Sequence, residues 1–248
     1  MPEAQPSLAF SIVLPMQNEA GHVAGLLAEI ERAFASFGPF EIVVVDDASR
    51  DRTADELTIA QKKIQNLRIV RHAKTCGQSQ AIISGVLAAR AEWIVTMDGD
   101  GQNDPADAAL LIAARDARDA ASKDILFIGH RTVRHNSPAK VLASRVANTV
   151  RAFVLGDATP DSGCGLKLFR RDLFMALPRF DALHRFMPAL VLRAGGAVVS
   201  IPVSHRARTY GRSHYGILSR GLLGVVDLVG VLWLMRRYTK PQVQNDLL

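Results

Sequence analysis

Residues 93–105 read WIVTMDGDGQNDP, an apolar run followed by a cluster of acidic residues. The first five residues of this stretch, 93–97, are apolar or β-branched, which predicts a short buried strand. Three carboxylates follow closely, at Asp98, Asp100 and Asp104. Helix capping accounts for Asp104, but it does not account for so many acids directly after an apolar strand. We therefore interpret the stretch as the end of a core strand that carries a functional site.

The same alternation of strand and helix extends outward from this strand. Short runs rich in Val and Ile occur at Phe10–Leu14, Glu41–Val45, Leu67–Val70, Trp93–Met97 and Ile125–Ile128. Segments with helical periodicity lie between them, at 20–36, 51–65, 78–91 and 106–120. After residue 137 the pattern is less regular and predicts helices over 138–154 and 184–194 and strands at Leu166–Phe169 and Ala197–Val203. This order predicts an α/β fold, a Rossmann-like and mostly parallel sheet with helices on both faces.

Ligands of such sheets bind beyond the carboxyl ends of the strands, and polar residues follow four of the predicted strands. They lie at Pro15–Glu19, Asp46–Asp51, Asp98–Pro105 and Gly129–Arg131. Asp98 and Asp100 flank a glycine, so both carboxylates can enter the same cleft, with Gln102 close by. Such oxygen ligands suit Mg²⁺ or Mn²⁺, and no Cys/His set for zinc is present in the sequence.

Charge is concentrated near the C-terminal end. The chain has a net charge of +6, and residues 205–240 contain seven Arg or Lys and one acid, so the whole excess lies there. This predicts contact with phosphates, an anionic membrane surface or nucleic acid. Nucleic acid is disfavoured because aromatic residues make up only 6% of the chain and the basic stretch is apolar in its middle.

The apolar middle of that stretch, Gly216–Met235, is interrupted by Asp227 and is too short for a confident membrane span. We expect an amphipathic helix in the membrane interface, and we divide the chain into a domain over 1–215 and a juxtamembrane segment over 216–248. The residues expected at the headgroups are Arg220, Arg236, Arg237 and Lys240, with Trp233 and Tyr238 at the boundary. A buried C-terminal helix or an oligomer contact stays open as the alternative.

Five motifs occur in order: FSIVLPMQNE, EIVVVDDASRD, CGQSQAIISG, WIVTMDGDGQNDP and DSGCGLKLFRRD. Together they resemble the family-2 glycosyltransferases with a GT-A fold. Within that family the sequence is most similar to the branch that loads a sugar onto a polyprenyl phosphate, as dolichyl-phosphate mannosyltransferase does. The resemblance covers residues 8–215.

The resemblance implies a role for each motif. The residues that would bind the nucleotide sugar are Pro15, Glu19, Asp46, Asp47 and Asp98, together with Arg208, Ser213 and His214 of a late loop that closes on the diphosphate. His214 departs from the family, in which Lys is common at this position. The metal ligands would be Asp98, Asp100 and Gln102, and the acceptor phosphate would be held by Arg131, Arg145 and Thr149. The catalytic residues would be Asp98, Asp100 and Arg131.

An ionised lipid phosphate needs no general base, unlike a sugar hydroxyl. The sequence therefore predicts an inverting glycosyltransferase that uses Mg²⁺ or Mn²⁺, a nucleotide-diphosphate sugar and a polyprenyl phosphate. Two cysteines and the lack of an apolar leader favour the reducing cytosol, so we expect the protein on the cytoplasmic face of the inner membrane. A homo-oligomer or a separate membrane-protein partner stays open.

Other classes of function fit less well. No G-x-G-x-x-G follows the first strand and no G-x-x-x-x-G-K-[ST] occurs, which disfavours dinucleotide and P-loop enzymes. Transfer to a sugar hydroxyl of a lipopolysaccharide or polysaccharide is the main alternative, and it would make Asp104 the candidate base. A non-catalytic membrane adaptor with a degenerate nucleotide site is a further alternative.

Overall fold

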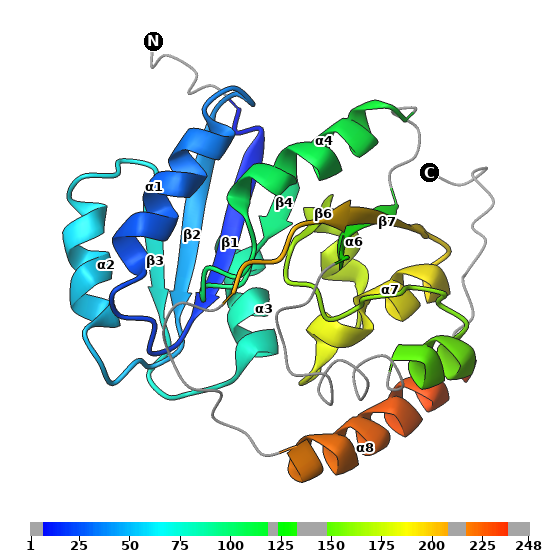
Figure 1. The fold of residues 1–248 in the computed structure, drawn as a ribbon. Helices are drawn as coiled ribbons and strands as arrows, with labels where there is room; N and C mark the ends of the chain where they lie inside the picture. Colours follow the sequence, from blue (N-terminus) through cyan, green and yellow to red (C-terminus); the bar gives the residue numbers. More distant parts are fainter. Residues whose placement is uncertain (1–6, 119–123, 133–147, 208–216, 238–248) are drawn as a thin grey trace, which may run out of the picture.

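The computed structural model describes residues 7–118, 124–132, 148–207 and 217–237, with the side chains of the last segment described from residue 224 onward. Seven strands form one sheet in the order β3-β2-β1-β4-β6-β5-β7 (Figure 1). The strands are β1 (Phe10–Met16), β2 (Phe40–Asp46), β3 (Leu67–Arg71), β4 (Trp93–Thr96), β5 (Ile125–Arg131), β6 (Lys167–Arg170) and β7 (Ala197–Val203). Strand β6 runs antiparallel to β4 and β5, and the other paired strands are parallel. The predicted α/β class is confirmed.

The central strands carry continuous apolar runs because both of their faces are covered. Ile12, Val13 and Leu14 of β1 are fully buried, as is the run 42–45 of β2. A strand with only one covered face would alternate apolar and polar residues, so these continuous runs are typical of a sheet between two helical layers.

The described helices follow the predicted order; the first four have shorter bounds than predicted, and the helix predicted at 184–194 begins one residue earlier. They are α1 (Val23–Phe34), α2 (Thr53–Gln61), α3 (Gln78–Ala88), α4 (Ala108–Asp116), α6 (Arg171–Ala176), α7 (Leu183–Arg193) and α8 (Ile217–Arg236), with a 3₁₀ turn at Pro105–Asp107 and helical residues at 148–155. Helices α1 and α2 contact each other, whereas α3 carries the chain back across the sheet, packs on β1 and β2 and contacts α7. The sequence did not predict α6, which directly follows β6.

Strand direction brings distant segments to one edge of the sheet. Strands β1, β2, β4 and β5 are co-directional, so their carboxyl ends lie at the same edge. Because β6 runs the other way, its first residue, Lys167, lies at this edge, and the preceding loop 161–165 enters there too. The strand order changes direction between β1 and β4, and such switch points are where α/β sheets bind ligands.

Helix α8 lies beside α7, at the end of the molecule toward which β1 and β3 point (Figure 1). Arg193 Nε donates to the Leu234 carbonyl oxygen at 3.0 Å, and Val231 is 2% exposed. The opposite face exposes Val225, Val226, Val229 and Trp233. The expectation of an amphipathic helix is therefore not confirmed, because apolar residues occupy both the packed and the exposed face.

No helix among the described residues is long and apolar enough to cross a membrane. The exposed valines and Trp233 nevertheless form a continuous apolar strip, since they fall at helical spacing on one face. Arg237 lies over the Trp233 ring, 5.8 Å from its centroid, at the C-terminal end of this strip. Arginine next to an exposed tryptophan places positive charge at the end of the apolar surface.

Candidate functional site

Asp98 follows β4, and three segments fix its position. Its backbone N–H donates to Asn103 Oδ1 at 3.0 Å, and Gln78 Nε2 at the start of α3 donates to its Oδ1 at 2.8 Å. On the third side lies Gly165, where an added Cβ would come within 2.3–2.5 Å of the carboxylate atoms. Only glycine leaves room there, so the carboxylate of Asp98 rests against the backbone of the 161–165 loop.

The surroundings of Asp98 suit a divalent cation. Burial and the nearby Asp100 carboxylate raise the pKa of Asp98 to about 6, against the opposing effect of Lys167 and Arg131. Asp100 Oδ1 accepts the backbone N–H of Gln102 at 3.1 Å, and this hydrogen bond stabilises the turn between the two residues. Two carboxylates that repel each other, with a side-chain amide in the same turn, fit the oxygen ligands that Mg²⁺ and Mn²⁺ prefer.

Behind Asp98 lies a buried group of charges. Lys167 is 2% exposed and its Nζ donates to the Cys164 carbonyl oxygen. Arg131 makes two bonds to Asp161, from Nε to Oδ2 at 2.7 Å and from Nη2 to Oδ1 at 2.9 Å. Burial lowers the pKa of Lys167, whereas at Arg131 the hydrogen bonds that it donates to Asp161, together with the charge of that carboxylate, outweigh burial and raise the pKa. Both cations act electrostatically on Asp98.

The two neighbouring acids after β2 have different surroundings. Asp46 lines a cavity of about 520 Å³, together with Arg50, Arg71 and Lys74. Asp47 is absent from that lining. Its oxygens instead accept the backbone N–H groups of 76 and 77 at 2.8 and 2.7 Å, and the Nδ1 atom of residue 72 lies 2.7 Å away. Asp46 therefore faces the cavity, whereas Asp47 holds the start of α3.

A second set of ligand atoms comes together at Asp47. The side chains of Asp47, His72 and Cys76 offer atoms that all lie within 4.8 Å of one another. The carboxylate of Asp47 already accepts two backbone N–H groups, and His72 also bonds Ser84 through Nε2 at 2.9 Å. Hydrogen bonds thus satisfy this group within the protein, and the Asp98–Asp100 turn is the better candidate metal site.

Pro15 and Glu19 lie at the end of β1. An added Cβ at Gly99 would lie 2.6 Å from the Pro15 carbonyl oxygen, so Pro15 packs directly on the turn that carries Asp98. The backbone N–H of Glu19 donates to Thr53 Oγ1 at 2.8 Å, which places Glu19 at the start of α2. The structure thus brings Pro15 to the Asp98 turn and places Glu19 further along the same loop.

The remaining predicted residues divide into two groups. Thr149 is exposed on the helical segment 148–155. The predicted residues that lie outside the described part of the chain are Arg145, Arg208, Ser213 and His214. Asp104, the base of the alternative mechanism, caps the 3₁₀ turn by accepting the Ala106 N–H at 3.0 Å and pairs with Arg206 at 2.7 Å.

Four further residues lie around Asp98 or Arg131 and were not among the predicted site residues: Gln78, Asp161, Gly165 and Lys167. All four occur in motifs singled out from the sequence. The motifs therefore pointed to these segments. Which side chains contact Asp98 or Arg131 depends on the order of the strands, which the motifs do not give.

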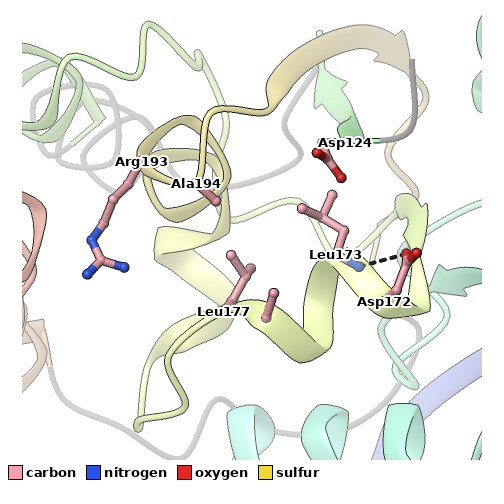
Figure 2. Close-up of a pocket in the computed structure, with 7 residues that line it drawn as sticks. Asp124, Asp172, Leu173, Leu177, Arg193 and Ala194 are labelled. Carbon is pink, nitrogen blue, oxygen red and sulfur yellow. Dashed lines mark hydrogen bonds between the residues drawn. The ribbon is translucent and has the colours of Figure 1, made fainter. Parts of the chain in front are cut away.

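Figure 2 shows a different pocket, of about 290 Å³, at the opposite edge of the sheet. Asp124, just before β5, lines it with Asp172, Leu173, Leu177, Arg193 and Ala194. Asp172 accepts the backbone N–H of Leu173 at 2.8 Å. None of the predicted site residues lines this pocket, so it is not the candidate site.

A sheet of this order, with paired carboxylates at its switch point, is typical of α/β proteins that bind nucleotides with a divalent cation. The model of the family described as "Glycosyl transferase family 2" matches residues 11–177. The chain belongs to this family, and its fold is the GT-A fold.

Similar proteins agree with this assignment. A dodecaprenyl-phosphate galacturonate synthase of Rhizobium johnstonii is 33% identical over 95% of this chain and 70% of its own length. An undecaprenyl-phosphate 4-deoxy-4-formamido-L-arabinose transferase of Edwardsiella ictaluri is 31% identical over 84% of this chain, which covers 63% of that relative. A mannosyltransferase of Pyrobaculum calidifontis, solved with GDP-Man and Mn²⁺, has a TM-score of 0.67 and 19% identity, covering 96% of this chain and 67% of its own.

The contact between Gly165 and Asp98 gives a first prediction. We expect Gly165→Ala to displace the Asp98 carboxylate and to weaken Mn²⁺ binding at least tenfold, as measured by calorimetric titration or electron paramagnetic resonance, since a metal site tolerates little misplacement of its ligands. Gly163→Ala is the matched control, because an added Cβ there meets nothing closer than 3.7 Å. Equal Mn²⁺ affinity in the two variants would contradict the placement of the metal at Asp98.

Proposed function

We propose that the protein transfers a sugar from a nucleotide-diphosphate sugar to a polyprenyl phosphate, with inversion at the anomeric carbon and with Mg²⁺ or Mn²⁺ bound at Asp98, Asp100 and Gln102. The observation that carries the proposal is the proximity of opposite charges at one sheet edge. The acidic Asp98–Asp100 turn suits a metal-bound diphosphate, and Arg131 beside it suits a second phosphate. The two relatives named for polyprenyl-phosphate chemistry support the same pair of substrates.

The nucleotide would lie across the switch point, with its base in the cavity beside Asp46 and its diphosphate at Asp98. Pro15 packs on the Asp98 turn and would contact the nucleotide between its base and its diphosphate. Glu19, Asp47, Arg208, Ser213 and His214 complete the nucleotide-sugar residues that we propose. A bound divalent cation would neutralise the charge of the departing diphosphate.

The acceptor phosphate would bind at Arg131, with Arg145 and Thr149. Because the phosphate is already ionised, no side chain has to remove a proton from it, and the protein needs only to align it with the anomeric carbon. A hydroxyl acceptor would instead need a base, for which Asp104 is the candidate. The Asp104 carboxylate already accepts the Ala106 N–H and pairs with Arg206, which favours the phosphate acceptor.

The reaction would take place at the cytoplasmic face of the inner membrane. The exposed strip of Val225, Val226, Val229 and Trp233 suits the apolar side of a lipid surface, and arginines at its end suit anionic headgroups. Asp227 on the same helix interacts electrostatically with Arg185 and Asp181 at the start of α7. Helix α7 contacts α3, and α3 carries Gln78, so the proposed membrane surface adjoins the elements of the site.

The test of this function is a product assay. We expect purified protein with Mn²⁺, undecaprenyl phosphate and a panel of UDP-, GDP- and TDP-sugars, including uronic acids and amino-arabinose derivatives, to form a lipid-phosphate-sugar detectable by mass spectrometry. Chelation of the metal by EDTA should stop the reaction. Sugar found only on an added polysaccharide, or only as free sugar, would refute the polyprenyl-phosphate acceptor.

Matched variants separate the roles in this assay. Asp100→Ala should lower turnover by at least a hundredfold, because a metal ligand is lost. Arg131→Ala should chiefly raise the KM for lipid phosphate. Asp104→Asn should leave lipid-phosphate transfer largely intact, whereas loss of turnover in this variant would favour a hydroxyl acceptor.

Membrane contact can be measured independently of turnover. We expect Val229→Glu to reduce cosedimentation with vesicles containing anionic lipid about tenfold, because it places a charge in the apolar strip. The control is Ile59→Glu on α2, an apolar side chain that is similarly exposed, at 55% against 61% for Val229. Equal vesicle binding of the two variants and the unaltered protein would argue against membrane contact through this strip.

A further inference from the structure

The pair formed by Arg131 and Asp161 has a defined orientation. The carboxylate takes the Nε–H and one Nη2–H of Arg131, at 2.7 and 2.9 Å, and the backbone N–H of Arg131 lies 3.3 Å from Oδ2. Asp161 is 1% exposed, whereas the Arg131 side chain is 18% exposed. The carboxylate is therefore the buried anchor, and the Arg131 side chain is the partly exposed member of the pair.

A guanidinium has five N–H groups arranged along its edges, and it binds carboxylates and phosphates with two parallel bonds. Asp161 occupies the edge formed by Nε and Nη2. Three N–H groups remain outside this pair, and two of them, one on Nη1 and one on Nη2, form the second edge. One edge thus fixes the side chain while the other is suited to a second oxyanion.

The location of this second edge is favourable for a substrate. Arg131 ends β5 at the same sheet edge as Asp98, and the charges of the two residues act on each other. Lys167, the other cation of this group, is 2% exposed and so is less accessible to a ligand. An added Cβ at Gly163 would lie 3.7 Å from Nη2, an ordinary van der Waals distance, so the loop passes close to the guanidinium without crowding it.

We propose that Asp161 is a positioning residue: it holds Arg131 by the Nε/Nη2 edge and presents the Nη1/Nη2 edge to the phosphate of the acceptor. The inference rests on the proposed function, because it assumes an anionic acceptor. The backbone supports the anchor, since the Cys164 N–H donates to the Asp161 carbonyl oxygen at 3.3 Å. A guanidinium fixed before the acceptor binds loses little conformational freedom on binding, which strengthens the contact.

The test compares KM values for the two substrates. In Asp161→Asn we expect the KM for undecaprenyl phosphate to rise about tenfold, the size of a misplaced charged hydrogen bond, with the KM for the nucleotide sugar unchanged. Asp161→Glu should not restore the KM, because the longer side chain keeps the charge but shifts the guanidinium. In an Arg131→Ala background, Asp161→Asn should add nothing, because the two residues act as one unit.

The matched control is Glu41→Gln. Glu41 is likewise a buried acid paired with an arginine, Arg68 at 3.0 Å. It lies near the amino end of β2, at the edge of the sheet away from the proposed site. This variant should lower the melting temperature without changing the KM for lipid phosphate. If Asp161→Asn fails to fold, the Arg131→Ala/Asp161→Ala pair removes both buried charges together and is compared with Arg131→Ala alone, to which it should be equal in KM.

The outcomes separate the inference from the function on which it rests. An active Asp161→Asn protein with an unchanged or lower KM for lipid phosphate overturns the inference alone. Full rescue by Asp161→Glu also overturns it, because charge and not position would then matter. An unaltered protein that forms no lipid product refutes the proposed function, and the inference fails with it.

Discussion

The contact between the Asp98 carboxylate and the backbone at Gly165 is the constraint on which the rest of the site depends. It joins the end of β4 to the loop before β6, two segments far apart in the chain, with no room for a side chain between them. The antiparallel direction of β6 makes this contact possible, because it brings the loop to the carboxyl edge of the sheet. Gln78 then closes the third side from α3. The departure from a purely parallel sheet is thus what builds the site.

Charge balance follows from this packing. Two carboxylates, Asp98 and Asp161, interact with two cations, Arg131 and Lys167, in a largely buried region. Removing one member would leave an uncompensated buried charge, which costs about 3–5 kcal/mol in proteins. Asp100 adds a further negative charge at the open side of this group, and its repulsion of Asp98 raises the free energy of the metal-free site. A divalent cation at the proposed site would relieve that repulsion, while Arg131 and Lys167 balance the charge of the buried carboxylates.

The sequence predicted the seven strands and the sheet edge because buried parallel strands and their polar ends are local patterns. It could not predict which side chains meet across that edge. The pairing of Arg131 with Asp161 depends on the order of β4, β6 and β5, and the same holds for Gln78 at Asp98. Asp46 and Asp47 are neighbours after the same strand and cannot be told apart from the sequence, yet their surroundings differ. Asp47 accepts the backbone N–H groups just before α3, whereas Asp46 lines the cavity. Helix α8 was expected to be amphipathic from its flanking charges, but packing on α7 buries one apolar face and leaves another exposed.

Among the described residues, one group of three ligand-bearing side chains has its ligand atoms within 4.8 Å of one another, at Asp47, His72 and Cys76, whereas the proposed chemistry requires a metal at Asp98 and Asp100. The group at Asp47 is satisfied by hydrogen bonds to backbone and side chains. The most direct measurement is an anomalous difference map from a crystal of the protein grown with Mn²⁺ and a nucleoside diphosphate. We expect the manganese peak between the diphosphate and the carboxylates of Asp98 and Asp100. A peak at Asp47, His72 and Cys76, with none at the Asp98 turn, would contradict the proposed site and the metal-assisted transfer built on it.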